Sequence, residues 1–323
     1  MGTLPVPISL LDRSRTRAGD DAGTALHDTV ARARRAEELG YRRIWVAEHH
    51  AVPGIASGSP PLLMAAIAAR TERIRVGSAG VMLPNHRPIV VAEQAKMLAA
   101  LHPGRIDLGV GRSLGFTEPV RDALGVHDYG PEHFARDLEE LTALLADTAP
   151  VTAMPKGGPA PPVLVLATGS GLAVAARLGL PVVVGGPLLR GDLAPLEDYR
   201  AGFRPQRPGD APRVLVSVDV LVADSREQAR ELAMPEAWAM VESRTTGAFP
   251  PLRPEPAMRL TARQQARVEE HLAATVHGTS EDVAEQLTGL VERTGADELV
   301  VFASTHDLAA LADSDAALAT LHP

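Results

Sequence analysis

The chain contains no cysteine, only two lysines and few aromatic residues. Without cysteine, the sequence excludes disulfides, thiolate catalysis and cysteine-ligated metal sites, and it fits a reducing cytoplasm. Nearly all the cations are arginines, because Lys96 and Lys156 are the only lysines. No Lys/Arg-rich stretch stands out, and the formal net charge is −8. This charge distribution argues against nucleic acid and anionic membranes as partners.

Long hydrophobic runs are also absent. No apolar run approaches the roughly 20 residues that a membrane-spanning helix needs. The first residues, MGTLPVPISLLDRSR, lack a basic segment followed by a long apolar stretch, so no signal peptide is expected. The 323 residues are 45% hydrophobic, which is enough for one large core or two modest ones. No change of composition and no repeat divides the chain, so we expect one domain over residues 1–323.

Short β-like runs alternate with helix-like segments along the whole chain. The runs are mostly continuous apolar stretches, as is typical of parallel strands covered on both faces. Eight strands alternating with helices predict an α/β fold, a (β/α)8 TIM barrel, with a doubly wound open sheet as the alternative. The predicted strands are residues 5–11, 43–47, 73–81, 105–110, 162–167, 181–184, 213–222 and 298–302.

The helical section between the last two predicted strands, residues 225–294, is unusually long. A Pro/Gly-rich stretch at 247–256 interrupts it, so we expect an insertion at this point of the barrel. The insertion is either a lid over the site or a surface loop. The predicted helices are residues 24–39, 60–70, 88–101, 131–146, 171–178, 225–243, 261–275, 280–294 and 306–320.

The strand at 43–47 ends in Glu48, His49 and His50, and the active site of such a barrel lies at the C-terminal ends of its strands. Adjacent strand residues point to opposite faces, so the two histidines are not expected to chelate one ion. Spaced His-x-His and HExxH patterns are absent as well, and we predict no metal site. Two interpretations remain: structural histidines, one packed and one at the surface, or an acid–base or cofactor contact.

Two glycine-rich turns follow predicted strands. RIDLGVGRSLG has the wrong third spacing for a dinucleotide fingerprint, and LVLATGSGLAVAARLG lacks the acid at the end of the next strand. Backbone amides at the turn of residues 168–171 would instead bind a phosphate, with Arg112 as its counter-charge. The alternative is that the glycines only turn the chain and that Arg112 pairs with a carboxylate.

Four segments resemble the luciferase-like monooxygenases, the bacterial luciferase family: LGYRRIWVAEHH, RIRVGSAGVMLPNHRPIVVAEQ, HPGRIDLGVGR and TGADELVV. The resemblance implies a barrel that binds flavin at the C-terminal ends of its strands. Members commonly use reduced FMN, supplied by a separate flavin reductase, together with molecular oxygen. A hydroperoxide at flavin C4a then oxidises a small-molecule substrate. Other members use a deazaflavin and transfer hydride without oxygen.

The resemblance also implies roles for individual residues. His49 takes the place of the family's histidine near the isoalloxazine ring, where it acts as a base or stabilises the peroxyflavin. Glu48 is its neighbour at the edge of the site, and we expect Glu48, His49 and His50 to be the catalytic residues. Ala79 and Gly80 match the position of a non-prolyl cis peptide behind the ring. The residues that match the FMN phosphate site are Arg112, Thr168, Gly169, Ser170 and Gly171.

The chain departs from the family pattern after the strand at 181–184. Many relatives carry aromatic or histidine residues there, whereas this chain has Gly185-Gly186-Pro187, which implies either a roomier pocket or a weakened flavin site. Phe116, Tyr129 and Phe134 are the rings closest to the strand at 105–110, and core packing is the favoured interpretation for each.

The function expected from the resemblance is an FMN-dependent monooxygenase of a two-component system. A deazaflavin-dependent oxidoreductase is the first alternative, but a deazaflavin has a longer acidic tail and no Lys/Arg-rich loop lies near the strand at 162–167. A catalytically silent flavin-binding protein is the second alternative. A homodimer is the family's default, and the sequence does not predict the substrate.

Overall fold

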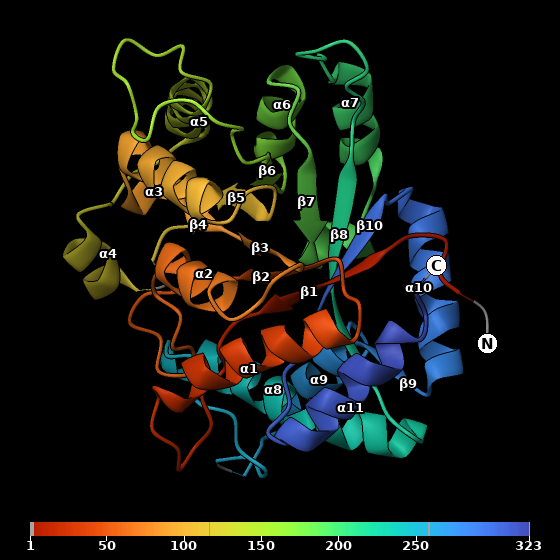
Figure 1. The fold of residues 1–323 in the computed structure, drawn as a ribbon. Helices are drawn as coiled ribbons and strands as arrows, with labels where there is room; N and C mark the ends of the chain where they lie inside the picture. Colours follow the sequence, from red (N-terminus) through yellow and green to blue (C-terminus); the bar gives the residue numbers. More distant parts are fainter. Residues whose placement is uncertain (1–2, 116, 258, 323) are drawn as a thin grey trace.

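Eight parallel strands close into a barrel that is surrounded by helices (Figure 1). The computed structural model describes residues 3–115, 117–257 and 259–322, so Phe116 lies outside the described residues. The last barrel strand pairs with the first and also with the seventh, which closes the ring. The barrel strands are β1 (Ile8–Asp12), β2 (Arg43–Val46), β3 (Arg75–Ser78), β5 (Ile106–Gly111), β6 (Val163–Leu166), β7 (Val182–Gly185), β8 (Val214–Val222) and β10 (Glu298–Phe302).

The closed barrel confirms the predicted (β/α)8 fold and rules out the open sheet. The short strand β9 (Val276–Gly278) was not predicted, and the short strand β4 (Val81–Met82) begins at the last residue of the predicted strand at 73–81. The predicted strand at 73–81 is in fact two strands, because a cis peptide bond between Ala79 and Gly80 separates β3 from β4.

All nine predicted helices are present, with ends shifted by a few residues. The matching helices are α1 (Thr24–Glu38), α2 (Pro60–Ala68), α3 (Pro88–Leu101), α5 (Pro131–Leu145), α6 (Ser170–Arg177), α8 (Arg226–Thr246), α9 (Ala262–Leu272), α10 (Ser280–Thr294) and α11 (Leu308–Ala319). The prediction missed α4 (Glu118–Leu124), α7 (Ala194–Gly202) and two short 3-10 helices, η1 (Leu83–Asn85) and η2 (Gly186–Arg190). Within the part of the chain that the structure describes, no helix is long and apolar enough to cross a membrane.

Alternate residues of each strand face two different cores. Leu10, Ile44 and Val76 belong to the large apolar layer between the strands and the helices. Leu11, Trp45 and other large side chains fill the barrel itself. The period of two along each strand therefore decides which side chains reach the interior.

A buried ion network lies at the N-terminal ends of the strands. Asp107 and Glu298 are fully buried there. Arg43 pairs with both, at 2.9 Å in each case, and the indole N–H of Trp45 donates to Asp107 at 3.2 Å. The Ser9 hydroxyl donates to Glu298. This network plugs the floor of the barrel and leaves the C-terminal mouth as the side from which a ligand would enter.

The insertion between β8 and β10 forms part of the mouth. Its loop at 247–256 is fixed to the loops that follow β1 and β2. The Gly54 N–H donates to the carbonyl of Phe249 at 2.7 Å, and the Leu252 N–H donates to the carbonyl of Thr16 at 2.9 Å. Leu252 is completely buried. The loop is thus packed on the barrel and is not a free surface loop.

Candidate active site

The end of β1 carries two arginines that share one buried carboxylate from the insertion. Glu236 of α8 is 2% exposed, accepts from Arg13 Nη2 at 2.8 Å and accepts from Arg15 Nε at 2.9 Å. Burial alone would raise the pKa of Glu236, but the charges of Arg13 and Arg15 hold it below its usual range. This arrangement anchors α8 on the barrel mouth and fixes the direction of Arg13.

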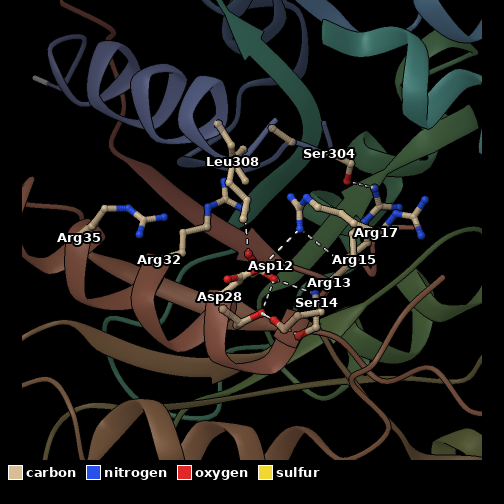
Figure 2. A pocket seen from close by; sticks show the side chains of 14 residues that line it. Asp12, Arg13, Ser14, Arg15, Arg17, Asp28, Arg32, Arg35, Ser304 and Leu308 are labelled. Atoms are coloured by element: carbon tan, nitrogen blue, oxygen red, sulfur yellow. Dashed lines mark hydrogen bonds and ion pairs between the residues drawn. The ribbon is translucent and has the colours of Figure 1, made fainter. Parts of the chain in front are cut away.

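A small polar pocket of about 20 Å³ lies next to the C-terminal end of β1, and the side chains that line it support this end (Figure 2). Asp12 lies at its centre and accepts from the Ser14 N–H at 2.7 Å, from the Thr29 hydroxyl at 2.8 Å and from Arg32 at 3.0 Å. Arg32 also donates to Asp315 at 2.7 Å. The pocket has room for about one water molecule, so we assign it a structural role.

His49 lies just after β2, and its backbone N–H donates to the carbonyl of Ser57 at 2.9 Å. Ala47, two residues earlier, belongs to the apolar cluster inside the barrel. Burial and the charge of Arg13 lower the pKa of His49 to about 4, although Glu48 acts in the opposite direction. His49 is therefore a neutral imidazole at pH 7, able to accept or donate a proton.

The low pKa of His49 predicts how folding stability changes with pH. The ordinary histidine pKa is 6.5, so between pH 6.5 and about 4 the unfolded chain is protonated at His49 and the folded chain is not. The stabilising contribution of neutral His49 to the free energy of unfolding is fully present above pH 6.5 and is lost as the pH falls toward 4. In urea unfolding, stability should fall more steeply over this window in the natural protein than in His49→Gln. Equal slopes would contradict the buried neutral imidazole.

Glu48 and His50 belong to a hydrogen-bonded cluster next to His49. The side chain of Glu48 is fully buried and accepts from Asn85 at 2.8 Å and from the Met82 N–H at 2.9 Å. His50 lies 2.7 Å and His86 3.0 Å from its oxygens. Burial would raise the pKa of Glu48, but these hydrogen bonds lower it to about 2. The cluster ties the end of β2 to the segment after β3, so Glu48 and His50 are placed to position His49.

The same cluster offers three possible metal ligands. The ligand atoms of Glu48, His50 and His86 lie within 4.8 Å of one another. The adjacent pair of histidines does not reveal the partnership with His86, which the histidine at the end of LPNH could have suggested. Each of the three side chains also hydrogen-bonds within the cluster, and the absence of a metal ion here stays a prediction.

The cis peptide bond between Ala79 and Gly80 is present, as the resemblance implied. Ala79 belongs to the apolar cluster inside the barrel. Gly80 has no space for a side chain, because a Cβ there would lie 2.8 Å from the carbonyl oxygen of Gly109. The two residues thus form a flat apolar part of the inner wall at the mouth.

Arg112 and Ser170 come together at the start of α6. Arg112 Nη2 donates to Ser170 Oγ at 3.2 Å, and within the described residues Arg112 has no carboxylate partner. Thr168 and Gly169 precede the helix, and Gly169 has a positive φ of 59°. The first amides of a helix have no partner within it. An unpaired guanidinium, a hydroxyl and these amides, including that of Gly171, form a donor set that suits a phosphate.

A large cavity of about 1280 Å³ lies between the mouth and the insertion. Arg13, Asp219 and Phe302 line it from the barrel side, and Gly186 and Pro187 line it at the end of β7. A side chain at Gly186 would meet nothing within 4 Å. Gly186 therefore leaves space, which agrees with the roomier of the two pockets considered for this position, whereas a Cβ at Gly185 would lie 2.8 Å from the carbonyl oxygen of Ser217.

The aromatic candidates near β5 are structural. Phe134 is completely buried in the core. Tyr129 stacks on His133 with ring centroids 5.9 Å apart, and its hydroxyl donates to Asp137 at 2.6 Å. Core packing, the favoured interpretation, is confirmed for Phe134, and Tyr129 has its partners on α5.

Comparison with known proteins identifies close relatives along the whole chain. A protein named luciferase-like monooxygenase from Escherichia coli (strain K12) is 35% identical over 92% of this chain and 91% of its own length. The N-acetyl-S-alkylcysteine monooxygenase of Bacillus subtilis (strain 168) is 32% identical over 92% of both chains. The crystal structure of apo-MsnO8 superimposes with a TM-score of 0.84 at 32% identity, covering 98% of both chains.

Two more distant structures share the fold. One is the oxygenating constituent of 3,6-diketocamphane monooxygenase from Pseudomonas putida in complex with FMN, with a TM-score of 0.75, 18% identity and coverage of 98% and 99%. The other is an F420-dependent secondary alcohol dehydrogenase in complex with an F420–acetone adduct, with a TM-score of 0.70, 16% identity and coverage of 98% of both chains. The family model for luciferase-like monooxygenases matches residues 6–298. The chain therefore belongs to the luciferase-like monooxygenase family.

Proposed function

We propose that this oxidoreductase is a monooxygenase that uses reduced FMN and molecular oxygen to oxidise a small organic molecule. The observation that carries the proposal is the donor set of Arg112, Ser170 and the first amides of α6, which lies at the same barrel mouth as neutral His49 and the cis bond after Ala79. Together they offer a phosphate site, a proton-transfer group and a flat apolar wall.

FMN is favoured over a deazaflavin by the size of the phosphate site. Among the described residues, Arg112 is the one cation that hydrogen-bonds to the start of α6, and it suits a single terminal phosphate. A deazaflavin of the F420 type carries a longer acidic tail and would gain from further cations there. One structural neighbour is F420-dependent, so a hydride-transferring deazaflavin enzyme is the second candidate.

Reduced FMN, when bound, would supply the electrons for the reduction of oxygen. The chain's own groups then have separate tasks. Arg112 and Ser170 would hold the phosphate, and Ala79-Gly80 would support the ring system. His49 would move a proton at its imidazole, held in place by the cluster around Glu48. The plugged barrel floor would limit access of bulk water from below.

We also propose where the substrate binds, which partner supplies the flavin, how the chain assembles and where it is located. Residues of the cavity beside Arg13 would bind the organic substrate. The relative that oxidises N-acetyl-S-alkylcysteine, at 32% identity, makes small thioethers reasonable first candidates. We propose a separate flavin reductase as the source of reduced FMN, a homodimer as the assembly and the cytoplasm as the location.

Arg112→Gln should weaken the binding of reduced FMN by about tenfold or more, because a charge-assisted hydrogen bond to the phosphate is lost. Ser170→Ala should weaken it less. Anaerobic fluorescence titration measures both. Arg177→Gln, at the far end of the same helix, is the matched control and should bind FMN as the natural protein does. Unchanged FMN affinity in Arg112→Gln would remove the phosphate site from the proposal.

A further inference from the structure

The cavity beside the barrel mouth has an unusual distribution of charge for this acidic chain. It extends from Ser217 and Asp219 inside the barrel to α8, α9 and α10 of the insertion. Six arginines and five acidic residues line it, although the whole chain carries a formal charge of −8. Two of the arginines are already paired, Arg13 with Glu236 and Arg226 with Asp282. The positive charge that is available to bind a ligand therefore comes from the other four arginines.

Arg190 and Arg244 face the cavity without partners. Arg190 ends η2, directly after β7, and Arg244 lies in the last turn of α8. Both are exposed, and neither side chain forms a hydrogen bond or ion pair within the described residues. They come from segments more than 50 residues apart in sequence, yet both line one cavity together with His271.

His271 of α9 lines the cavity, and its pKa responds to the charges around it. Burial lowers its pKa, and the charges of Arg13, Arg244 and Arg190 lower it further, with only Glu236 acting against them. The charges of the three guanidinium groups therefore act on His271, and all three arginines line the cavity together with it. His271 is neutral at pH 7 and adds a hydrogen-bonding group without adding charge.

Glu236 and Asp219 do not cancel the charges of the arginines that act on His271. Glu236 is shared between Arg13 and Arg15, so one carboxylate compensates two guanidinium groups. Asp219 of β8 lies beside Phe302 of the neighbouring strand β10 on the inner barrel wall. Burial raises the pKa of the Asp219 carboxyl to about 7, so it is partly neutral at neutral pH. Arg190 and Arg244 therefore keep their charges without a carboxylate partner among the described residues, although Glu270 lines the cavity beside His271.

We propose that the cavity takes an anionic organic substrate, whose carboxylate or similar acid group is bound by Arg190 and Arg244. Guanidinium groups bind such oxyanions through paired hydrogen bonds, and both groups are free to do so. Met240, Val241 and Leu290 line the same cavity and would contact the apolar part of the molecule. The inference rests on the proposed function, because it names the substrate class of that site.

Matched acid and carboxamide pairs test the charge preference directly. We would use octanoate, hexadecanoate and N-acetyl-S-methylcysteine, each with its carboxamide, and measure binding by calorimetry. At least one acid should bind about tenfold or more better than its amide, as expected for a charge-assisted contact. Arg190→Gln and Arg244→Gln should each reduce that preference, and the double variant should remove it.

Arg263→Gln is the control, because Arg263 is an exposed arginine of α9 that does not line the cavity. It should keep the full preference. The absence of an acid preference in all three pairs, including no binding at all, overturns the inference, and so does a preference that survives in the double variant. Binding of reduced FMN is measured separately on the same samples, so failure of the proposed function is distinguished from failure of the anion site.

Discussion

Replacement of His49 by alanine should lower turnover by about 10²–10⁴-fold, which is the usual contribution of a positioned proton-transfer group. Binding of reduced FMN should change little, because the proposed phosphate contacts lie at Arg112 and Ser170. The neutral imidazole at the end of β2 is placed to accept or donate a proton, and alanine can do neither. Single-turnover oxidation with a saturating amount of reduced FMN measures the effect on the reaction alone.

The control for this variant is His27→Ala, which removes an exposed histidine from the outer face of α1. It should retain full turnover. If His49→Ala binds reduced FMN normally and turns over at the natural rate, His49 has no role in proton transfer. If the protein binds FMN but no variant and no natural sample oxidises any substrate, the catalytically silent alternative gains support.

Replacement of Glu236 by alanine should lower the free energy of unfolding by about 3–5 kcal/mol, the range for breaking one side of a buried ion pair. Arg13 and Arg15 would keep their charges without the carboxylate between them. The loss of this link should also loosen α8 and with it one wall of the large cavity. Urea unfolding followed by circular dichroism measures the change.

Glu231→Ala is the matched control, because Glu231 is an exposed acid on the same helix. Its effect on stability should be within a few tenths of a kcal/mol, as for most surface substitutions. Glu236→Gln should be intermediate, since the amide keeps one acceptor. A loss below about 1 kcal/mol for Glu236→Ala would contradict the role of this carboxylate as the anchor of the insertion.

Local patterns were sufficient to predict the barrel. Continuous apolar runs marked each barrel strand, and helical spacing with Pro or Gly at the ends marked nine helices. The helix α4 was missed because it has no buried residue and therefore no apolar stripe. The strand at 73–81 was predicted to be too long because no local propensity indicates the cis bond between Ala79 and Gly80. Only the family resemblance indicated that bond.

The candidate site was predicted only where its residues are close in sequence or carry a family motif. Glu48, His49 and His50 stand out at the end of a strand. The pairing of Arg13 with Glu236 joins residues 223 positions apart, and no local pattern reveals such a contact. A charged residue within the apolar run AMPEAWAM of α8 was the available signal. The free arginines of the cavity, Arg190 and Arg244, become recognisable only when the fold brings them together.

The most direct test of the proposed function is anaerobic equilibrium binding of reduced FMN, oxidised FMN and reduced deazaflavin, followed by mixing with oxygen. We expect the tightest binding for reduced FMN, and oxygen uptake by the complex that is coupled to oxidation of an organic substrate. Tighter binding of the reduced deazaflavin, with a complex that does not consume oxygen, would contradict it and would favour hydride transfer.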